Sequence, residues 1–191
     1  MFDIREGDLS DIQVRDLLAL HLASMHDHSP PGSVFALDLS GLQVAEVTVW
    51  TAWRGSSLAG VGALKMLADG NGEVKSMRTH PDFLRMGAAA TILEMIIAAA
   101  SARGARQLSL ETGSGPAFEP ALALYRRRGF HNGTAFSTYR PSDFNQFLHL
   151  DLTGALQQTS RVEERNFHAI LTRSRWCWTG HASNFLRRIV I

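Results

Sequence analysis

A loop of small residues followed by an apolar helix is the part of the chain best suited to bind an anion. The stretch Arg85-Met-Gly-Ala-Ala-Ala90 follows an extended run at 72–79 and precedes a segment with helical periodicity. The first N–H groups of a helix have no partner within the helix, and they carry a partial positive charge. Small side chains let a phosphate approach that backbone closely. The spacing therefore predicts a phosphate or diphosphate site at this loop.

The apolar pattern predicts strands and helices that hold this loop in place. After Gly87, Ile92 with Ile96 and Leu93 with Ile97 are spaced by four, which predicts a helix with one buried face. Residues 46–53 and 58–67 read as a hairpin. We expect further strands at 2–5, 72–79, 107–111 and 144–152, and helices from a cap at Asp8 or Ser10 towards His26, within 34–42, and at 116–128. This order predicts a mixed α/β sheet with a crossover connection.

Composition excludes several classes of protein. The chain has 191 residues, 45% of them hydrophobic, and a formal net charge of +1, which argues against a large nucleic-acid surface. Its single cysteine, Cys177, excludes an internal disulfide. The apolar run at 88–100 is shorter than the roughly 20 residues of a membrane span. The polar start does not fit a secretory or mitochondrial leader, so we expect a cytoplasmic protein.

The charge balance divides the chain in two. Residues 153–191 carry six arginines against two glutamates, a net charge of +4, whereas residues 1–152 have a net charge of −3. We therefore expect one domain over 1–152 and a basic C-terminal extension over 153–191. His26-Asp-His28 has the residue types of a metal site but no further ligand cluster, so no metal is predicted.

Three segments together resemble the GCN5-related N-acetyltransferase (GNAT) superfamily. They are Glu73-Val-Lys-Ser-Met-Arg78, Arg85-Met-Gly-Ala-Ala-Ala90 and Leu122-Ala-Leu-Tyr-Arg-Arg-Arg-Gly-Phe130. The last matches the family's helix that ends in Leu-Tyr and is followed by Gly-Phe. The wider resemblance covers about residues 2–152. The family's loop is commonly Arg/Gln-x-x-Gly-x-Gly/Ala; Gly87 and Ala89 fit it, whereas Leu84 takes the Arg/Gln position.

The resemblance implies an α/β fold of the α+β type, in which helices flank a mixed, mostly antiparallel central sheet. It also implies acetyl-CoA as co-substrate. The residues implied for coenzyme binding are Met77, Arg78 and Thr79 on the strand and Leu84, Arg85, Met86, Gly87, Ala88, Ala89 and Ala90 at the loop and helix start. Either Arg85 or backbone N–H groups would replace the side-chain donor that Leu84 lacks. The pantetheine arm would pair with the edge of the strand at 77–79.

Acetyl transfer to an amine needs a proton acceptor for the amine and a proton donor for the departing thiolate. Glu73 lies 14 residues before Gly87, about where histone-modifying family members carry their general base, so the resemblance nominates it. A water chain is the alternative. Tyr125 would supply the general acid, and a backbone N–H near Met77 would stabilise the oxyanion. Strand alternation predicts Glu73, Lys75 and Met77 on one face.

The expected reaction is acetyl transfer to a primary amine of a small molecule or an amino acid. One competing hypothesis is a catalytically silent sensor of acyl-CoA, which would keep the loop but not need Glu73 or Tyr125. Another is an interaction protein whose basic extension docks an acidic partner or nucleic acid. No membrane partner is expected, and a homodimer is left open.

Overall fold

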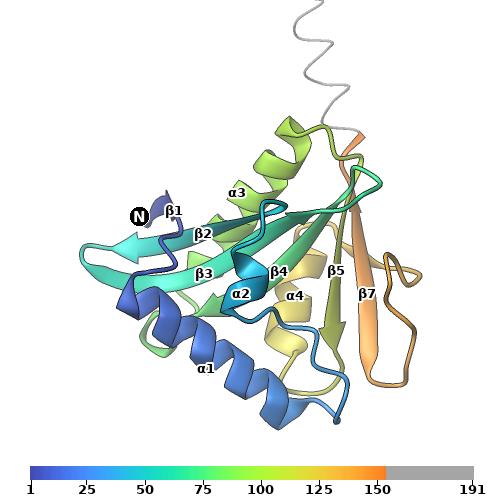
Figure 1. Cartoon of the computed structure of the whole chain (residues 1–191), viewed down its shortest axis with the longest axis horizontal. Helices are drawn as coiled ribbons and strands as arrows, with labels where there is room; N and C mark the ends of the chain where they lie inside the picture. Colours follow the sequence, from blue (N-terminus) through green and yellow to red (C-terminus); the bar gives the residue numbers. More distant parts are fainter. Residues whose placement is uncertain (154–191) are drawn as a thin grey trace, which may run out of the picture. The chain divides into compact units, whose positions relative to one another are not determined.

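The computed structural model describes residues 1–153, so the basic extension predicted over 153–191 lies almost wholly outside the described residues. The described residues form a seven-stranded sheet in the order β1-β2-β3-β4-β5-β7-β6 (Figure 1). The strands are β1 (Asp3–Glu6), β2 (Val47–Arg54), β3 (Ser57–Met66), β4 (Gly72–Thr79), β5 (Gln107–Gly113), β6 (His131–Asn132) and β7 (Asn145–Asp151). The predicted hairpin forms as β2 and β3.

Neighbouring strands run antiparallel, except that β4 and β5 run parallel. A parallel pair needs a crossover, and α3 (Ala88–Ala102) supplies it. The mixed, mostly antiparallel sheet flanked by helices is thereby confirmed.

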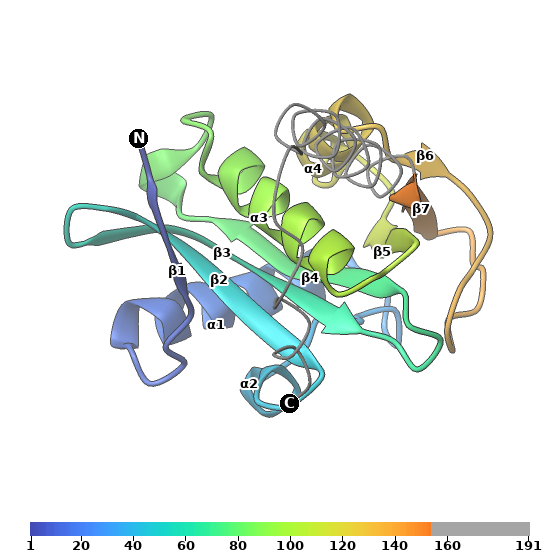
Figure 2. The same cartoon turned by 90° about the horizontal axis from the view of Figure 1, so that it is seen from above.

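Helices cover both faces of the sheet. α1 (Ile12–His28) and α2 (Leu39–Leu42) lie on one face, whereas α3 and α4 (Glu119–Arg127) lie on the other (Figures 1 and 2). Each face has its own apolar core. In α3 the side chains of Ile92, Leu93 and Ile96 are fully buried, as their spacing predicted.

The first helix, α1, has its N-cap later in the chain than either predicted cap. Asp11 is the N-cap, and its carboxylate accepts hydrogen bonds from the N–H groups of Gln13 and Val14. The carboxylate of Asp8 is already occupied by the N–H and hydroxyl of Ser10 at 2.8 and 2.7 Å. Asp8 therefore closes the preceding turn instead, and the predicted caps at Asp8 and Ser10 were wrong.

The last helix also begins later than predicted. The expected helix over 116–128 is observed as α4, from Glu119 to Arg127. Residues 116–118 form a turn instead, in which the Phe118 N–H donates to the Gly115 carbonyl at 3.0 Å. Pro120 then occupies the first turn of the helix, where its missing N–H costs nothing.

The parallel strands β4 and β5 separate soon after they meet. They pair only at Gly72 with Leu108 and at Glu73 with Ser109. Beyond these two positions β4 pairs with β3 alone and β5 with β7 alone. The two strands therefore face each other with unpaired backbone edges, and a wedge-shaped opening forms in the middle of the sheet.

Candidate active site

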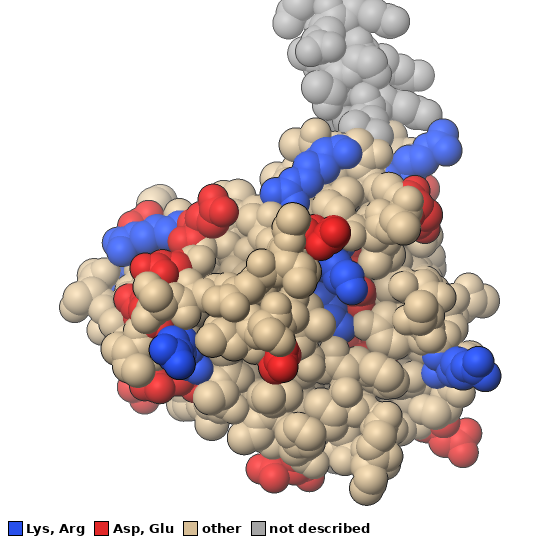
Figure 3. Space-filling view, viewed as in Figure 1, with Lys and Arg blue, Asp and Glu red and all other residues tan. Residues whose placement is uncertain are grey.

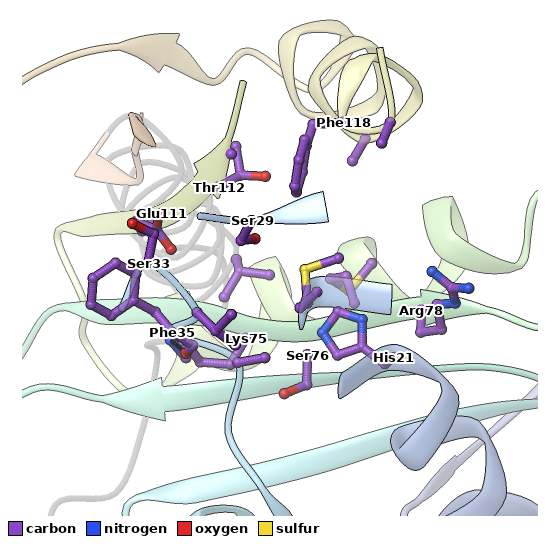
Figure 4. Close-up of a pocket in the computed structure, with 18 of the residues that line it drawn as sticks. His21, Ser29, Ser33, Phe35, Lys75, Ser76, Arg78, Glu111, Thr112 and Phe118 are labelled. Carbon is purple, nitrogen blue, oxygen red and sulfur yellow. Dashed lines mark hydrogen bonds between the residues drawn. The ribbon is translucent and has the colours of Figure 1, made fainter. Parts of the chain in front are cut away.

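A cavity of about 160 Å³ occupies the opening between β4 and β5. Its lining comes from both faces of the sheet. α1 and the segment after it contribute His21, Met25, Ser33 and Phe35, whereas Phe118 and Tyr125 come from the α4 side. Figure 4 shows Glu111, Phe35 and Lys75 towards one end of the cavity and Arg78 at the other, with Ser76 and His21 between them. Two reactants could thus meet here from opposite faces.

A bulge in β4 decides which side chains reach each face. Ser76 has a φ of 52°, and the pairing with β3 shifts there, so that Lys75 lies opposite Ala63 and Arg78 opposite Val61. Both partners belong to the core beneath α1. Glu73, Lys75 and Arg78 therefore share the α1 face, whereas Met77 packs with the α3 core. The predicted common face for Glu73, Lys75 and Met77 was wrong for Met77, because the extra residue reverses the alternation.

A buried polar network stands at the α1 face of the opening. Glu73 is only 2% exposed and accepts a 2.5 Å hydrogen bond from the Tyr139 hydroxyl. The Lys75 ammonium lies 3.3 Å from the same carboxylate and donates to the Tyr139 oxygen at 2.7 Å and to the Phe35 carbonyl at 2.8 Å. Burial, and then the charge of Glu73, raise the pKa of Tyr139, so its phenol keeps its proton. Glu73 is thus enclosed by partners and does not line the cavity.

Glu111, on β5, is the carboxyl group that lines the cavity. Burial raises its pKa to about 7; Lys75 opposes this rise and the charge of Glu73 adds to it. A carboxyl group that titrates near neutral pH can accept a proton from an ammonium and release it to solvent. Figure 3 shows acidic and cationic atoms meeting in a hollow near the centre of this face.

Tyr125, the predicted proton donor, reaches the cavity from α4. Its side chain is 6% exposed, and among residues 1–153 its hydroxyl has no hydrogen-bond partner. Burial raises the pKa of Tyr125, so the group is a protonated phenol at any physiological pH. Such a phenol can donate a hydrogen bond or a proton into the opening.

The start of α3 presents unpaired backbone donors. The first N–H bonded within the helix is that of Thr91, to the Gly87 carbonyl at 3.0 Å, which leaves the amides of Ala88, Ala89 and Ala90 unpaired by residues 1–153. Gly87 has a φ of 92°, and a Cβ built on it would meet no atom within 4 Å. No side chain caps the helix. The geometry therefore suits a phosphate group.

The remaining predicted coenzyme residues lie around this helix start. Leu84 and Met86 are 59% and 49% exposed, and Arg85 is exposed with a φ of 62°. Along β4, the backbone of 77–79 faces the opening without a strand partner on the β5 side. The Arg78 side chain, however, lies on the α1 face and donates to the Ser24 hydroxyl at 3.3 Å. Only its backbone is placed to contact a ligand along the strand edge.

Comparison with known proteins decides the family. Residues 13–130 match the model of the acetyltransferase (GNAT) family. The chain belongs to this family. It is an acyltransferase, similar over most of its length to proteins named as N-acetyltransferases. It is 44% identical to uncharacterized N-acetyltransferase YedL of Escherichia coli, over 80% of this chain and 96% of that protein.

A second relative and a solved structure agree with this assignment. Identity to uncharacterized N-acetyltransferase YsnE of Bacillus subtilis is 48%, over 76% of this chain and 96% of that protein. The fold matches a Bacillus subtilis acetyltransferase solved in complex with CoA, with a TM-score of 0.59 and 21% identity over 79% of this chain and 99% of that one.

Residues 1–153 contain neither a metal-binding cluster nor a membrane-spanning helix. In that range, no group of three or more His, Cys, Asp or Glu side chains is placed to hold a metal ion. The helices of the same range include none long and apolar enough to cross a membrane.

Sequence reasoning missed two groups at the opening. Glu111 follows Leu108-Ser-Leu110, and strand alternation alone would place it on the face opposite to the two leucines. That signal was available. His21 had none, because a helix far from β4 in sequence brings it to the opening.

Proposed function

We propose that the protein transfers an acetyl group from acetyl-CoA to a primary amine of a small molecule or amino acid. The supporting observation is one cavity that has the carboxyl group of Glu111 on one face of the sheet and the phenol of Tyr125 on the other. A proton acceptor and a proton donor are the two groups that aminolysis of a thioester needs.

The residues fit the coenzyme in two respects. Free amides at Ala88, Ala89 and Ala90, beside the open space at Gly87, would hold its phosphates. The unpaired β4 edge at 77–79 would pair with the amides of its pantetheine arm. Because backbone donors dominate this arrangement, the missing donor at Leu84 is tolerated, and Arg85 and Met86 would flank the phosphates. When bound, acetyl-CoA supplies the thioester whose acetyl group is transferred.

In our proposal Glu111 takes the role of general base. Glu73, which the family resemblance nominated, would act behind it as a positioning residue. It holds Lys75 and Tyr139, and its charge helps to raise the pKa of Glu111. Glu111 would accept the proton of the acceptor's ammonium, so that the neutral amine can attack.

The two remaining roles fall to the opposite side of the opening. A backbone amide near Met77, at the bulge, would donate a hydrogen bond to the carbonyl oxygen as negative charge develops on it. The carbon–nitrogen bond forms first, and Tyr125 would then donate a proton to the sulfur as the carbon–sulfur bond breaks. The second proton that the nitrogen loses would restore the phenol of Tyr125. A cytoplasmic location, a homodimer and a role for the basic extension stay predictions.

The first test is a free-thiol release assay with acetyl-CoA across amines, polyamines and amino acids, combined with calorimetric binding of acetyl-CoA. We expect binding and amine-dependent thiol release. If acetyl-CoA does not bind, the proposal fails. If it binds and no amine is acetylated, the chain is a coenzyme sensor instead.

Tyr125→Phe tests the proton donor. The substitution removes only the hydroxyl, so we expect turnover to fall at least tenfold while the affinity for acetyl-CoA, measured by calorimetry, changes little. An unchanged turnover would remove Tyr125 from the mechanism.

A further inference from the structure

Arg78 is a cation that the described residues leave largely unsatisfied. A guanidinium has five N–H donors. Within residues 1–153, the side chain of Arg78 makes a single hydrogen bond, to the hydroxyl of Ser24. No carboxylate in the same range lies within ion-pair distance of its guanidinium. Its Nε atom is buried without a partner. Burial lowers the pKa of Arg78, because a charged group is less stable away from water.

Two other residues that line the cavity also carry an unsatisfied polar atom. Within residues 1–153, three buried side-chain atoms lack a hydrogen-bond partner, namely Nδ1 of His21, Oγ of Ser76 and Nε of Arg78. All three residues line the cavity. Since buried polar groups are normally hydrogen-bonded, such a set of atoms indicates a place that a ligand completes.

The electrostatic field at this end of the cavity is positive. Burial, and then the charges of Arg78 and Lys75, lower the pKa of His21 to about 4. His21 is therefore neutral at physiological pH, so it neither adds to the positive charge nor cancels it. Lys75 is compensated by Glu73, at 3.3 Å, but Arg78 has no such partner in residues 1–153. A bound anion would relieve this imbalance.

The opposite end of the cavity carries the proposed base. Glu111 and Arg78 lie on the α1 face of β5 and β4 respectively, and Figure 4 shows them at opposite ends of the same cavity. The phosphate-binding amides of α3 belong to the other face of the sheet. Arg78 is thus directed to the acceptor rather than to the coenzyme.

We propose that Arg78 binds a carboxylate of the acceptor, so that the substrates are amino acids or similar small molecules bearing both an amine and a carboxylate. This inference rests on the proposed function. The planar guanidinium suits a planar carboxylate, which can accept two parallel hydrogen bonds. With the carboxylate held at Arg78, the amine extends towards Glu111. A cavity of about 160 Å³ suits a ligand of this size.

The test compares amino acids with their carboxamides, which keep the shape and the amine but lose the negative charge. For the full chain we expect kcat/KM to favour the acids at least tenfold. In Arg78→Met this preference should fall at least tenfold, mainly through KM, and Arg78→Lys should retain part of it. Arg15→Met is the matched control, since Arg15 is exposed on α1 and its loss removes the same charge. The amines of the acids and the carboxamides differ in basicity. This difference is the same for every variant, so it cancels when the acid-to-carboxamide ratios of kcat/KM are compared between variants.

Two results would overturn the assignment: equal use of acids and carboxamides by the wild-type protein, or an unchanged preference in Arg78→Met. Calorimetry with the amino acids separates this proposal from the general one. If no amine of either series is acetylated, binding of the acids that is lost in Arg78→Met still supports the carboxylate site. An absence of binding refutes it.

Discussion

The two faces of the opening between β4 and β5 are built from different chemistry. On the α3/α4 face the groups are backbone amides, apolar side chains such as Phe118, and the uncharged phenol of Tyr125. On the α1 face they are charged, and they include Glu111 and Arg78. Backbone donors recognise a phosphate whatever side chains surround them, whereas a charged side chain recognises a particular partner. The first face thus suits a fixed coenzyme, and we propose that the second sets the choice of acceptor.

The largest effect should follow from removing the proposed base on the α1 face. Glu111→Gln should lower kcat/KM for the amine about 100-fold, in the range of general-base catalysis. Glu111 must lose its proton to act, so wild-type activity should rise with pH through about 7, the pKa that burial gives this group. The variant should lose that rise. Steady-state kinetics from pH 5 to 9 measures both effects.

Glu46→Gln is the control for this substitution, because Glu46 is exposed in the turn immediately before β2. We expect this variant to keep the wild-type kcat/KM and the wild-type rise in activity with pH. A Glu111→Gln variant with an intact rise in activity near pH 7 would transfer the base role to another group, with Glu73 and water as the candidates.

A smaller effect of a different kind should follow from Glu73→Gln. The substitution leaves the buried Lys75 without its carboxylate, so we expect a loss of unfolding free energy on the order of 3 kcal/mol in urea. The charge of Glu73 raises the pKa of Glu111, so its removal should move the rise in activity to lower pH rather than abolish it. A profile that instead loses its rise altogether would make Glu73 the base.

The smallest effect should appear on the coenzyme face, at Gly87. Alanine is strained at a φ of 92°, so Gly87→Ala should cost about 1–2 kcal/mol of unfolding free energy. It should also raise the KM for acetyl-CoA, because the helix start must shift. Gly104→Ala is the matched control: its φ is 80°, its surroundings are equally open, and it lies beyond the other end of α3. A similar rise in KM in both variants would show that Gly87 has no special part in coenzyme binding.

The elements with regular patterns were predictable from the sequence. The hairpin of β2 and β3, the strand β4 and the buried face of α3 all follow from local periodicity, which the tertiary structure then uses unchanged. The start of α4 and the cap of α1 were misplaced. In both cases neighbouring turns compete for the same backbone groups, and one sequence pattern fits several registers.

What the sequence determined by itself is the proposed coenzyme face, because its chemistry lies in contiguous residues. Gly87 and the alanines that follow it create the free amides wherever the helix is placed. The proposed acceptor face was decided only by the tertiary structure. A single bulge at Ser76 turns Met77 away and places Arg78 on the same face of β4 as Lys75, and the parting of β4 from β5 opens the space between Arg78 and Glu111. Burial then raises the pKa of Glu111, and no carboxylate among residues 1–153 lies within ion-pair distance of Arg78. Neither property can be read from local sequence, since each depends on residues that are distant along the chain.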